Sequence, residues 1–262
     1  MTISQPDLQA ITGGFMAALR ANTLYLPSSA TSAAAAPLSM ADAVALQRGF
    51  VELHSTFDRV AGYKSAANAP ALQTALGLSE PIVGVLFAGG ERSSGARIER
   101  AAYRTLLIET ELGFYIGRPI EARMNNVAEL RNAVTSCVPM IELADPGFGR
   151  TRFNGLDLIA TNSASAGFIC GNPQLVTQID VNDIPVRLSH AGTTLHAEQS
   201  RDLMGDQWQA LLWLVNKVID VGYQINPGQL FMTGALGGAH PALPGEYLAQ
   251  FGTLGEVRFS VS

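Results

Sequence analysis

The sequence predicts an α+β protein, because helical patterns come first and a strand-dominated body follows them. Apolar residues recur at helical spacing over residues 5–22, and again after Ser39, which can cap a second helix. Beyond these helices, short apolar runs are separated by glycine and proline. We therefore expect a helical region over residues 1–57, packed on a body over residues 58–262 as a single structural unit.

The body's strands are predicted from short apolar runs bounded by turn residues. The expected strands are 60–66, 82–87, 106–116, 138–143, 230–234 and 256–261, with an alternating, meander-like stretch over 174–196. The expected helices between them are 70–76, 126–133 and 206–222. The Ser/Ala/Pro-rich stretch from Pro27 to Pro37 predicts a loop, and residues 91–105 predict a polar excursion.

Composition and charge limit the classes of function that fit. With 262 residues, 47% of them hydrophobic, the chain can build one large core. A net charge of −5 without any basic run argues against a nucleic-acid surface. No basic segment precedes an apolar one at the N-terminus, and no apolar run could span a bilayer, so we expect a cytoplasmic protein without a membrane partner. Cys137 and Cys170 lack metal-type spacing and are expected to be buried, reduced thiols.

Two glutamates, Glu109 and Glu111, stand two residues apart in an otherwise apolar run. Alternate side chains of a strand share a face, so both carboxylates are expected on one face, with Ile108 and Thr110 on the other. Their repulsion is relieved if water solvates an exposed face, or if a divalent cation lies between them. Glu142, in a second apolar strand, could join the pair as a third carboxylate and leave metal positions open for substrate.

Two further segments place polar groups at strand ends. Lys64 ends a glycine-containing strand and could neutralise a substrate carboxylate or move a proton. Thr233 and Gly234 offer a hydroxyl and an unobstructed backbone amide where an oxyanion could be held. His240, in an expected loop after two glycines, is a weaker candidate. The sequence contains neither a GxSxG nor an HExxH motif, which argues against serine-hydrolase and zinc-peptidase chemistry.

In their order and spacing these segments resemble the fumarylacetoacetate hydrolase superfamily, and within it the 2-keto-4-pentenoate hydratase/4-oxalocrotonate decarboxylase branch. The resemblance runs from about residue 8 to the C-terminus. The segments that carry it are Gly62-Tyr63-Lys64, Gln73 to Gly77, Ile108-Glu109-Thr110-Glu111, Ile141-Glu142, Asp157 to Asn162, Leu214 to Lys217, and Thr233-Gly234-Ala235-Leu236.

The resemblance implies a mixed β-sandwich roll of the fumarylacetoacetate hydrolase C-terminal type, with N-terminal and peripheral helices. It implies hydration of a 2-hydroxy-2,4-dienoate from aromatic-ring degradation to a 4-hydroxy-2-oxo acid, by a homo-oligomer that uses Mg²⁺ or Mn²⁺. The implied metal ligands are Glu109, Glu111 and Glu142. The implied substrate-binding residues are Lys64, Asn162, Ser163, Thr233 and Gly234, and Lys64 would also assist proton transfer.

Several positions depart from the branch's motifs, and they bear on the substrate more than on the fold or the metal. The departures are Ala66 for a glycine, Thr161 for an aspartate, Ser163-Ala164 for Ala-Ser, and Asp206-Gln207 for His-Pro. Two enzymatic alternatives therefore stay open: a decarboxylase of a 2-oxo-3-enedioate such as 4-oxalocrotonate, and a C–C hydrolase. Outside enzymes, a degenerate member would bind a ligand or a partner enzyme without turnover.

Overall fold

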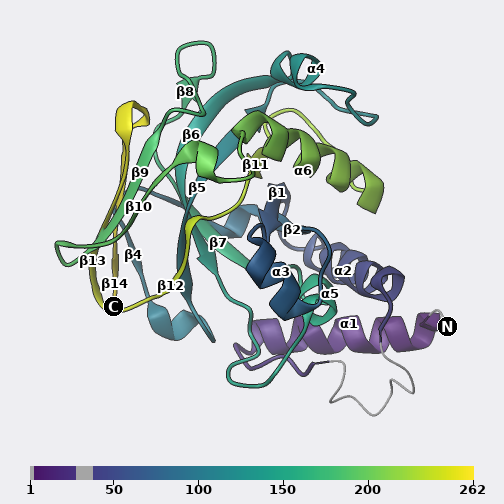
Figure 1. Ribbon diagram of the computed structural model, residues 1–262. Helices are drawn as coiled ribbons and strands as arrows, with labels where there is room; N and C mark the ends of the chain where they lie inside the picture. The colour runs from purple at the N-terminus through teal and green to yellow at the C-terminus, as the bar shows by residue number, and fades with distance from the viewer. Residues whose placement is uncertain (1–2, 28–37) are drawn as a thin grey trace.

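The computed structural model describes residues 3–27 and 38–262 and shows an α+β fold built on two β-sheets (Figure 1). The predicted loop from Pro27 to Pro37 lies outside the described residues except for Pro27. The helices are α1 (Gln5–Arg20), α2 (Met40–His54), α3 (Pro70–Leu76), α4 (Val127–Arg131), α5 (Gly155–Ala160) and α6 (Gln207–Val221). The short 3₁₀ turns are η2 (Ala88–Gly90), η3 (Arg100–Ala102), η4 (Ser200–Asp202) and η5 (Gly252–Leu254).

The larger sheet has nine strands, and its main path runs β2-β1-β11-β5-β6-β7-β3, with β12 also paired to β5 and β8 to β6. Its strands are β1 (Val60–Ala66), β2 (Ile82–Phe87), β3 (Glu91–Ser93), β5 (Leu107–Ile116), β6 (Val134–Ala144), β7 (Ser165–Cys170), β8 (Gln174–Leu175), β11 (Leu230–Met232) and β12 (Leu236–Pro241). At its centre, β5 and β6 form a long antiparallel ladder. This ladder is the rigid support on which the candidate site is built.

The smaller sheet has five strands in the order β10-β9-β13-β14-β4. Its strands are β4 (Ala96–Ile98), β9 (Pro185–His190), β10 (Thr193–Gln199), β13 (Gly245–Phe251) and β14 (Glu256–Val261). It packs against the larger sheet where β14 meets β6 and β10 meets β12. One continuous apolar core, which includes Phe114 from the larger sheet and Phe259 from the smaller, joins the two sheets.

The longer helices begin and end at capping residues. The Ser39 hydroxyl accepts a hydrogen bond from the Asp42 amide, and the Asp42 carboxylate bonds back to the Ser39 amide, which forms a capping box for α2. The Asp206 side chain caps α6, and Gly222 ends it in the left-handed conformation with φ 91°. These caps confirm the predicted ends of both helices to within a residue or two.

Several helices gather around the β2–β1–β11 edge of the larger sheet. In Figure 1, α1 and α2 lie together at the end of the molecule opposite β14, and α6 lies over the β1–β11 region. Contacts join α1 to α2, α2 to α5, and α6 to β1, β2 and β11. Within the described residues, no helix combines the length and apolar character needed to cross a membrane. The predicted boundary between residues 57 and 58 stays a prediction.

Most predicted elements are confirmed, and two expectations needed correction. The loop expected around His240 is wrong, because Leu236–Pro241 forms strand β12 along β5. The meander expected over residues 174–196 is too long: β8 covers only Gln174–Leu175, and regular pairing resumes at the β9–β10 hairpin. Both Cys137 and Cys170 are free thiols; Cys137 is buried and Cys170 half-buried.

Candidate metal and substrate site

Three glutamates converge at the centre of the larger sheet. The antiparallel register of β5 and β6 places Glu109 directly opposite Glu142, and Glu111 follows two residues later on the same face of β5. One carboxylate oxygen from each glutamate lies within 4.8 Å of the other two. The predicted same-face pair and its third member from a neighbouring strand are therefore confirmed as a cluster.

The cluster contains carboxylate oxygens that the protein does not satisfy. Glu111 and Glu142 are fully buried. The Oε2 atom of Glu111 accepts a hydrogen bond from the Gly234 amide at 2.9 Å, but its Oε1 atom has no partner, and neither has Oε2 of Glu142. Unpartnered buried oxygens are unfavourable, and hard oxygen ligands are what Mg²⁺, Ca²⁺ and Mn²⁺ bind. The three carboxylates could therefore hold a divalent metal ion.

The glutamates are hard to ionise together in the metal-free protein. Burial raises the pKa of Glu109 to about 8; Glu142 adds to the rise and Lys64 opposes it. Burial also raises the pKa of Glu111, with Glu142 and Glu109 adding to the effect. At neutral pH the metal-free site therefore keeps protons on its carboxyl groups, and a metal ion would displace these protons.

Lys64 enters the cluster from strand β1, which β11 separates from β5. Its Nζ atom lies 2.6 Å from Oε1 of Glu142, and the residue is only 1% exposed. Burial alone would lower the pKa of Lys64, but Glu142 and the other two glutamates outweigh burial and raise it. Gly62 lets β1 run close beside β11, because a Cβ there would lie 1.8 Å from the Leu230 carbonyl oxygen. Lys64 is thus a charged, buried counter-ion of the glutamates.

The Thr233-Gly234 segment closes the cluster from the end of β11. The Thr233 hydroxyl donates a 2.8 Å hydrogen bond to the Gln207 side chain. Gly234 has φ 124°, and a Cβ there would lie 2.2 Å from Oδ1 of Asn68, so only glycine fits this position. Its amide donates a hydrogen bond to Oε2 of Glu111. The predicted contact of both residues with substrate stays a prediction.

Asn162 and Ser163 lie in a tight turn between α5 and β7, both in the left-handed conformation, with φ 69° and 55°. The Asn162 side chain holds the β2 backbone, since its Oδ1 accepts from the Val85 amide at 2.8 Å and its Nδ2 donates to the Val85 carbonyl at 2.9 Å. The Ser163 hydroxyl donates to the Val83 carbonyl at 2.7 Å. Their predicted contact with substrate is likewise untested.

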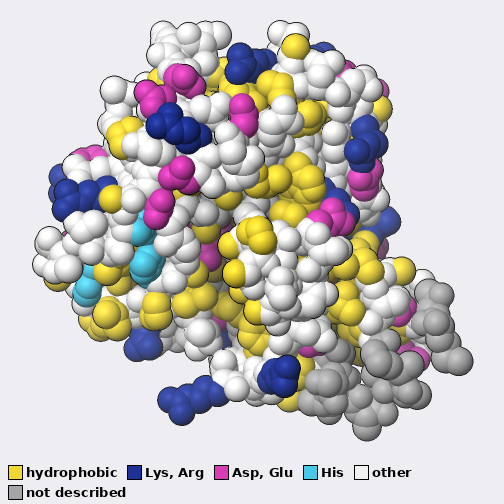
Figure 2. All heavy atoms as spheres, in the orientation of Figure 1, with side chains coloured by type: hydrophobic (Ala, Val, Ile, Leu, Met, Phe, Trp, Pro, Cys, Tyr) yellow, Lys and Arg dark blue, Asp and Glu magenta, His cyan; other side chains and the backbone are white. Residues whose placement is uncertain are grey.

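A cavity of 810 Å³ opens above Lys64 and Glu109. Ser163 lines it, whereas Asn162 and Thr233 do not. Its other walls come from α3, α5, the segment after η4, and β12. Figure 2 shows hydrophobic side chains gathered around a hollow on this face, over the region where Figure 1 draws α3 and β12. The volume lies within the range of about 300–1,000 Å³ that is typical of ligand sites.

Behind the glutamates, a hydrogen-bonded chain fixes β5 on its opposite face. The Thr110 hydroxyl donates to the Leu236 carbonyl at 2.8 Å, so Nε2 of His196, 3.0 Å away, serves as the donor to that hydroxyl. The Nδ1 atom of His196 then accepts from Nε2 of His240 at 2.8 Å. His240, predicted as a weak site candidate, therefore lies behind the strand and contacts His196.

The sequence did not indicate two parts of this site. Asn68, whose side chain packs against Gly234, indicates only a helix start in the sequence. The apolar wall residues Leu72 and Met204 lie far apart in the chain and have no motif of their own. Only the folded structure brings these segments together, so no local signal could have identified them.

The fold and the site together define a class: α+β proteins with a central mixed sheet and a carboxylate triad that could hold a divalent cation. Residues 60–261 match the family defined as fumarylacetoacetate (FAA) hydrolase C-terminal. The chain belongs to the fumarylacetoacetate hydrolase family.

Curated relatives and a solved structure agree with this assignment. The chain is 29% identical to 2-keto-4-pentenoate hydratase of Burkholderia vietnamiensis over 203 residues, 77% of this chain and 78% of that one. It is 26% identical to 2-oxo-hept-4-ene-1,7-dioate hydratase of Escherichia coli, covering 84% and 86% of the two chains. Its fold matches 4-oxalocrotonate decarboxylase from Pseudomonas putida G7, complexed with magnesium and adipate, with a TM-score of 0.90 at 19% identity, over 100% of this chain and 99% of that chain.

Proposed function

We propose that this protein is a divalent-metal-dependent hydro-lyase that hydrates a 2-hydroxy-2,4-dienoate to a 4-hydroxy-2-oxo acid, in the breakdown of aromatic compounds. The single observation that carries the proposal is the Glu109–Glu111–Glu142 triad, which has two fully buried members and lies with Lys64 beside a cavity. The names of the relatives above support the hydratase reaction over other activities in the family.

The triad would hold Mg²⁺ or Mn²⁺, because its unpartnered oxygens are hard ligands. When bound, such an ion supplies Lewis-acid stabilisation of negative charge on substrate oxygens. The structural neighbour complexed with magnesium supports the choice of metal. The Gly234 amide would keep one Glu111 oxygen fixed, so that the other oxygen faces the ion.

The reaction requires two proton movements and one addition of water. The dienol hydroxyl loses its proton while C5 gains one, which leaves a conjugated 2-oxo-3-enoate; water then adds its oxygen to C4 and a proton to C3. Among the described residues that line the cavity, Lys64 carries the one ammonium group. We assign to it the binding of the substrate carboxylate and the transfer of a proton. Ser163, which lines the cavity, would contact the substrate directly.

We assign positioning roles to Asn162 and Thr233, whose side chains already bond to Val85 and Gln207. Asn162 would act by holding the turn that presents Ser163, and Thr233 by holding the strand end that presents Gly234. We also propose that the protein acts in the cytoplasm as a homo-oligomer, as the family resemblance implies. Light scattering on a sizing column would test the oligomeric state.

The test follows the loss of the dienoate chromophore in ultraviolet light. A parallel reaction measures carbon dioxide evolved from a 2-oxo-3-enedioate such as 4-oxalocrotonate, because only the enedioate carries the carboxyl group that a decarboxylase would release. We expect Mg²⁺-dependent loss without gas. Gas release at the same rate would instead establish the decarboxylase, which the full-length fold match with 4-oxalocrotonate decarboxylase makes the second candidate.

Metal binding is tested separately by calorimetry with Mg²⁺ alone. Glu142→Gln should weaken binding at least about a hundredfold, because it removes one of three anionic ligands. Glu80→Gln, which changes a half-exposed carboxylate on the surface, is the matched control and should bind like the parent protein. Equal Mg²⁺ binding by both variants would show that the triad is not the metal site.

A further inference from the structure

The cavity above Lys64 is lined in part by polar groups, which we call its polar end, and in part by a mainly apolar wall, which we call its apolar end. Lys64, Glu109 and Ser163 lie at the polar end, which fits the carboxylate and 2-oxygen of a dienoate. The remaining wall comes from four separate segments and carries mainly apolar side chains. These are Leu72, Leu76, Pro146, Phe153, Leu158 and Met204.

Two of these apolar residues are unusually exposed. Leu72 on α3 is 47% exposed, and Met204 after η4 is 43% exposed. Exposed apolar area that lines a concave surface is a feature of ligand sites rather than of ordinary protein surface. An apolar group bound here would remove both side chains from water.

The charges around the cavity argue against an anionic group at the apolar end. Among the described residues that line it, Lys64 is the single basic side chain, and it is paired with Glu142. Two acidic residues, Glu198 and Asp202, also line the cavity. Residues 1–2 and 28–37, outside the described part, contain no lysine or arginine.

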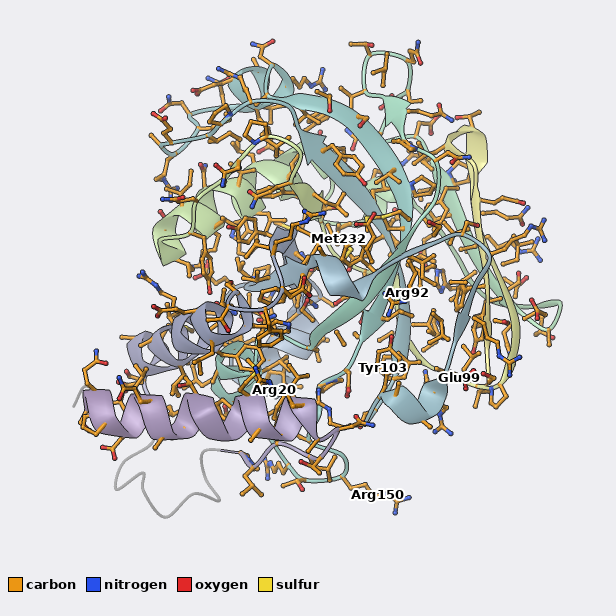
Figure 3. All side chains as sticks on the ribbon, turned by 180° about the vertical axis from the view of Figure 1, so that it is seen from behind. Arg20, Arg92, Glu99, Tyr103, Arg150 and Met232 are labelled. Atoms are coloured by element: carbon orange, nitrogen blue, oxygen red, sulfur yellow. The ribbon has the colours of Figure 1, made fainter. Side chains whose placement is uncertain are left out.

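The nearest arginines along the chain do not supply a cation either. Arg150 and Arg152 belong to the same loop as Pro146 and Phe153, but both are exposed and neither lines the cavity. In Figure 3, which shows the molecule from behind, the Arg150 side chain points away from the body of the protein. A second substrate carboxylate would therefore lie against a wall that offers it no lysine or arginine.

We infer that the substrate is a monocarboxylate, R–CH=CH–CH=C(OH)–COO⁻, in which R is a bulky, uncharged, apolar group such as an alkyl chain or an aryl ring. This inference rests on the proposed function. The cavity of 810 Å³ is far larger than an unsubstituted five-carbon dienoate requires, and its apolar end is where R on C5 would lie. Dioates, the substrates named for some relatives, are expected to be poor substrates here.

The size of the effect follows from the two ends of the cavity. Filling an apolar pocket changes kcat/KM by about tenfold or more per group, so the aryl substrate should exceed the unsubstituted one by at least about tenfold. A carboxylate placed among apolar walls and beside two acidic side chains loses solvation and gains repulsion. The dioate should therefore fall at least about a hundredfold below the aryl substrate.

The experiment compares three dienoates that carry hydrogen, phenyl or a carboxymethyl group at C5, with saturating Mg²⁺. A preference for phenyl in kcat/KM is expected; equal or better turnover of the dioate or of the unsubstituted acid would overturn the inference. Binding of the saturated 2-oxo acids with the same three tails is measured by calorimetry. If no dienoate is hydrated, the proposed function fails, while the binding order still decides the preference for the tail.

Two lysine substitutions on the same exposed helix provide a matched pair. Leu72→Lys places an ammonium group at the apolar end and should raise the dioate-to-phenyl ratio of kcat/KM at least about tenfold. Ala75→Lys lies on α3 but outside the cavity wall, and it should leave that ratio unchanged. An equal shift in both variants, or a shift in neither, would contradict the placement of R against α3.

Discussion

Replacing Lys64 by methionine should destabilise the metal-free protein strongly. The Nζ atom of Lys64 lies 2.6 Å from Glu142, and the two side chains are 2% and 1% exposed. Removing one partner of a buried ion pair leaves the other charge uncompensated, which costs about 3–5 kcal/mol. Because Glu142 can take up a proton instead, we expect the lower end, about 3 kcal/mol, or a fall in Tm of about 6–12 °C for a chain of this size.

Mg²⁺ should reverse most of this loss, because the cation replaces the lysine as counter-charge for the glutamates. With saturating Mg²⁺ we expect Lys64→Met to cost about 1 kcal/mol in the free energy of unfolding. By thermodynamic linkage, the difference of about 2 kcal/mol means that the variant binds Mg²⁺ about thirtyfold tighter than the parent. Urea unfolding with EDTA or Mg²⁺, together with calorimetry, measures both quantities.

The matched control is Lys217→Met, on α6. Lys217 also forms an ion pair, with Glu80 at 2.7 Å, but the two side chains are 30% and 45% exposed. An exposed pair contributes less than about 1 kcal/mol, and this one lies outside the metal site, so no Mg²⁺ dependence is expected. If Lys64→Met were equally destabilised with and without Mg²⁺, or bound Mg²⁺ more weakly, Lys64 would not be the resident counter-ion.

Three further outcomes are expected. Gly62→Ala should destabilise the protein by about 3 kcal/mol or more, because its Cβ would meet the backbone of β11; a lower Tm and a lower soluble yield would show this. Gly13→Ala, which has open space around it, should leave the stability unchanged. Since the pKa of Glu109 is raised to about 8, Mg²⁺ affinity measured by calorimetry should rise roughly tenfold per pH unit from pH 6.5 towards 8, and a flat profile would exclude proton release from this group. Burial and the neighbouring His240 lower the pKa of His196 to about 4. Between pH 6.5 and 4 the native state therefore binds fewer protons than the unfolded state, so the free energy of unfolding falls as the pH falls through that window. His196→Gln should remove about 1 kcal/mol of that loss in urea unfolding without metal; an unchanged pH slope would show that His196 is not responsible.

The parts of the site that follow from local spacing could be predicted from the sequence. Glu109 and Glu111 share a face because side chains alternate along any strand, and the apolar run around them predicts a buried strand. The ends of α6 were predictable for a similar reason, since Asp206 and Gly222 cap the helix through its own backbone. In each case the determining interaction lies within a few residues of the side chain concerned.

Features set by packing between distant segments could not be predicted in this way. Gly237 and Gly238 favour a loop by their intrinsic preference, yet they belong to β12 because β5 offers an unpaired edge beside them. The position of His196 behind Thr110 depends on how the smaller sheet packs on the larger one. The apolar end of the cavity is likewise assembled from segments more than a hundred residues apart, such as those of Leu72 and Met204.

The residues that depart from the family's motifs differ in what they contact. Asp206, in place of histidine, caps α6 through its carboxylate, and Thr161, in place of aspartate, donates its hydroxyl to the carbonyl of Asp157. Both residues support backbone and neither lines the cavity. Ala66, Ser163 and Ala164, in contrast, line it: Ala66 adds a methyl group where the motif has glycine, and serine and alanine have exchanged places at 163 and 164. The changes that reach the cavity therefore add one methyl group and move one hydroxyl by one residue, while the carboxylate cluster stays complete. This combination is expected if the metal chemistry is shared and the way the substrate is held differs.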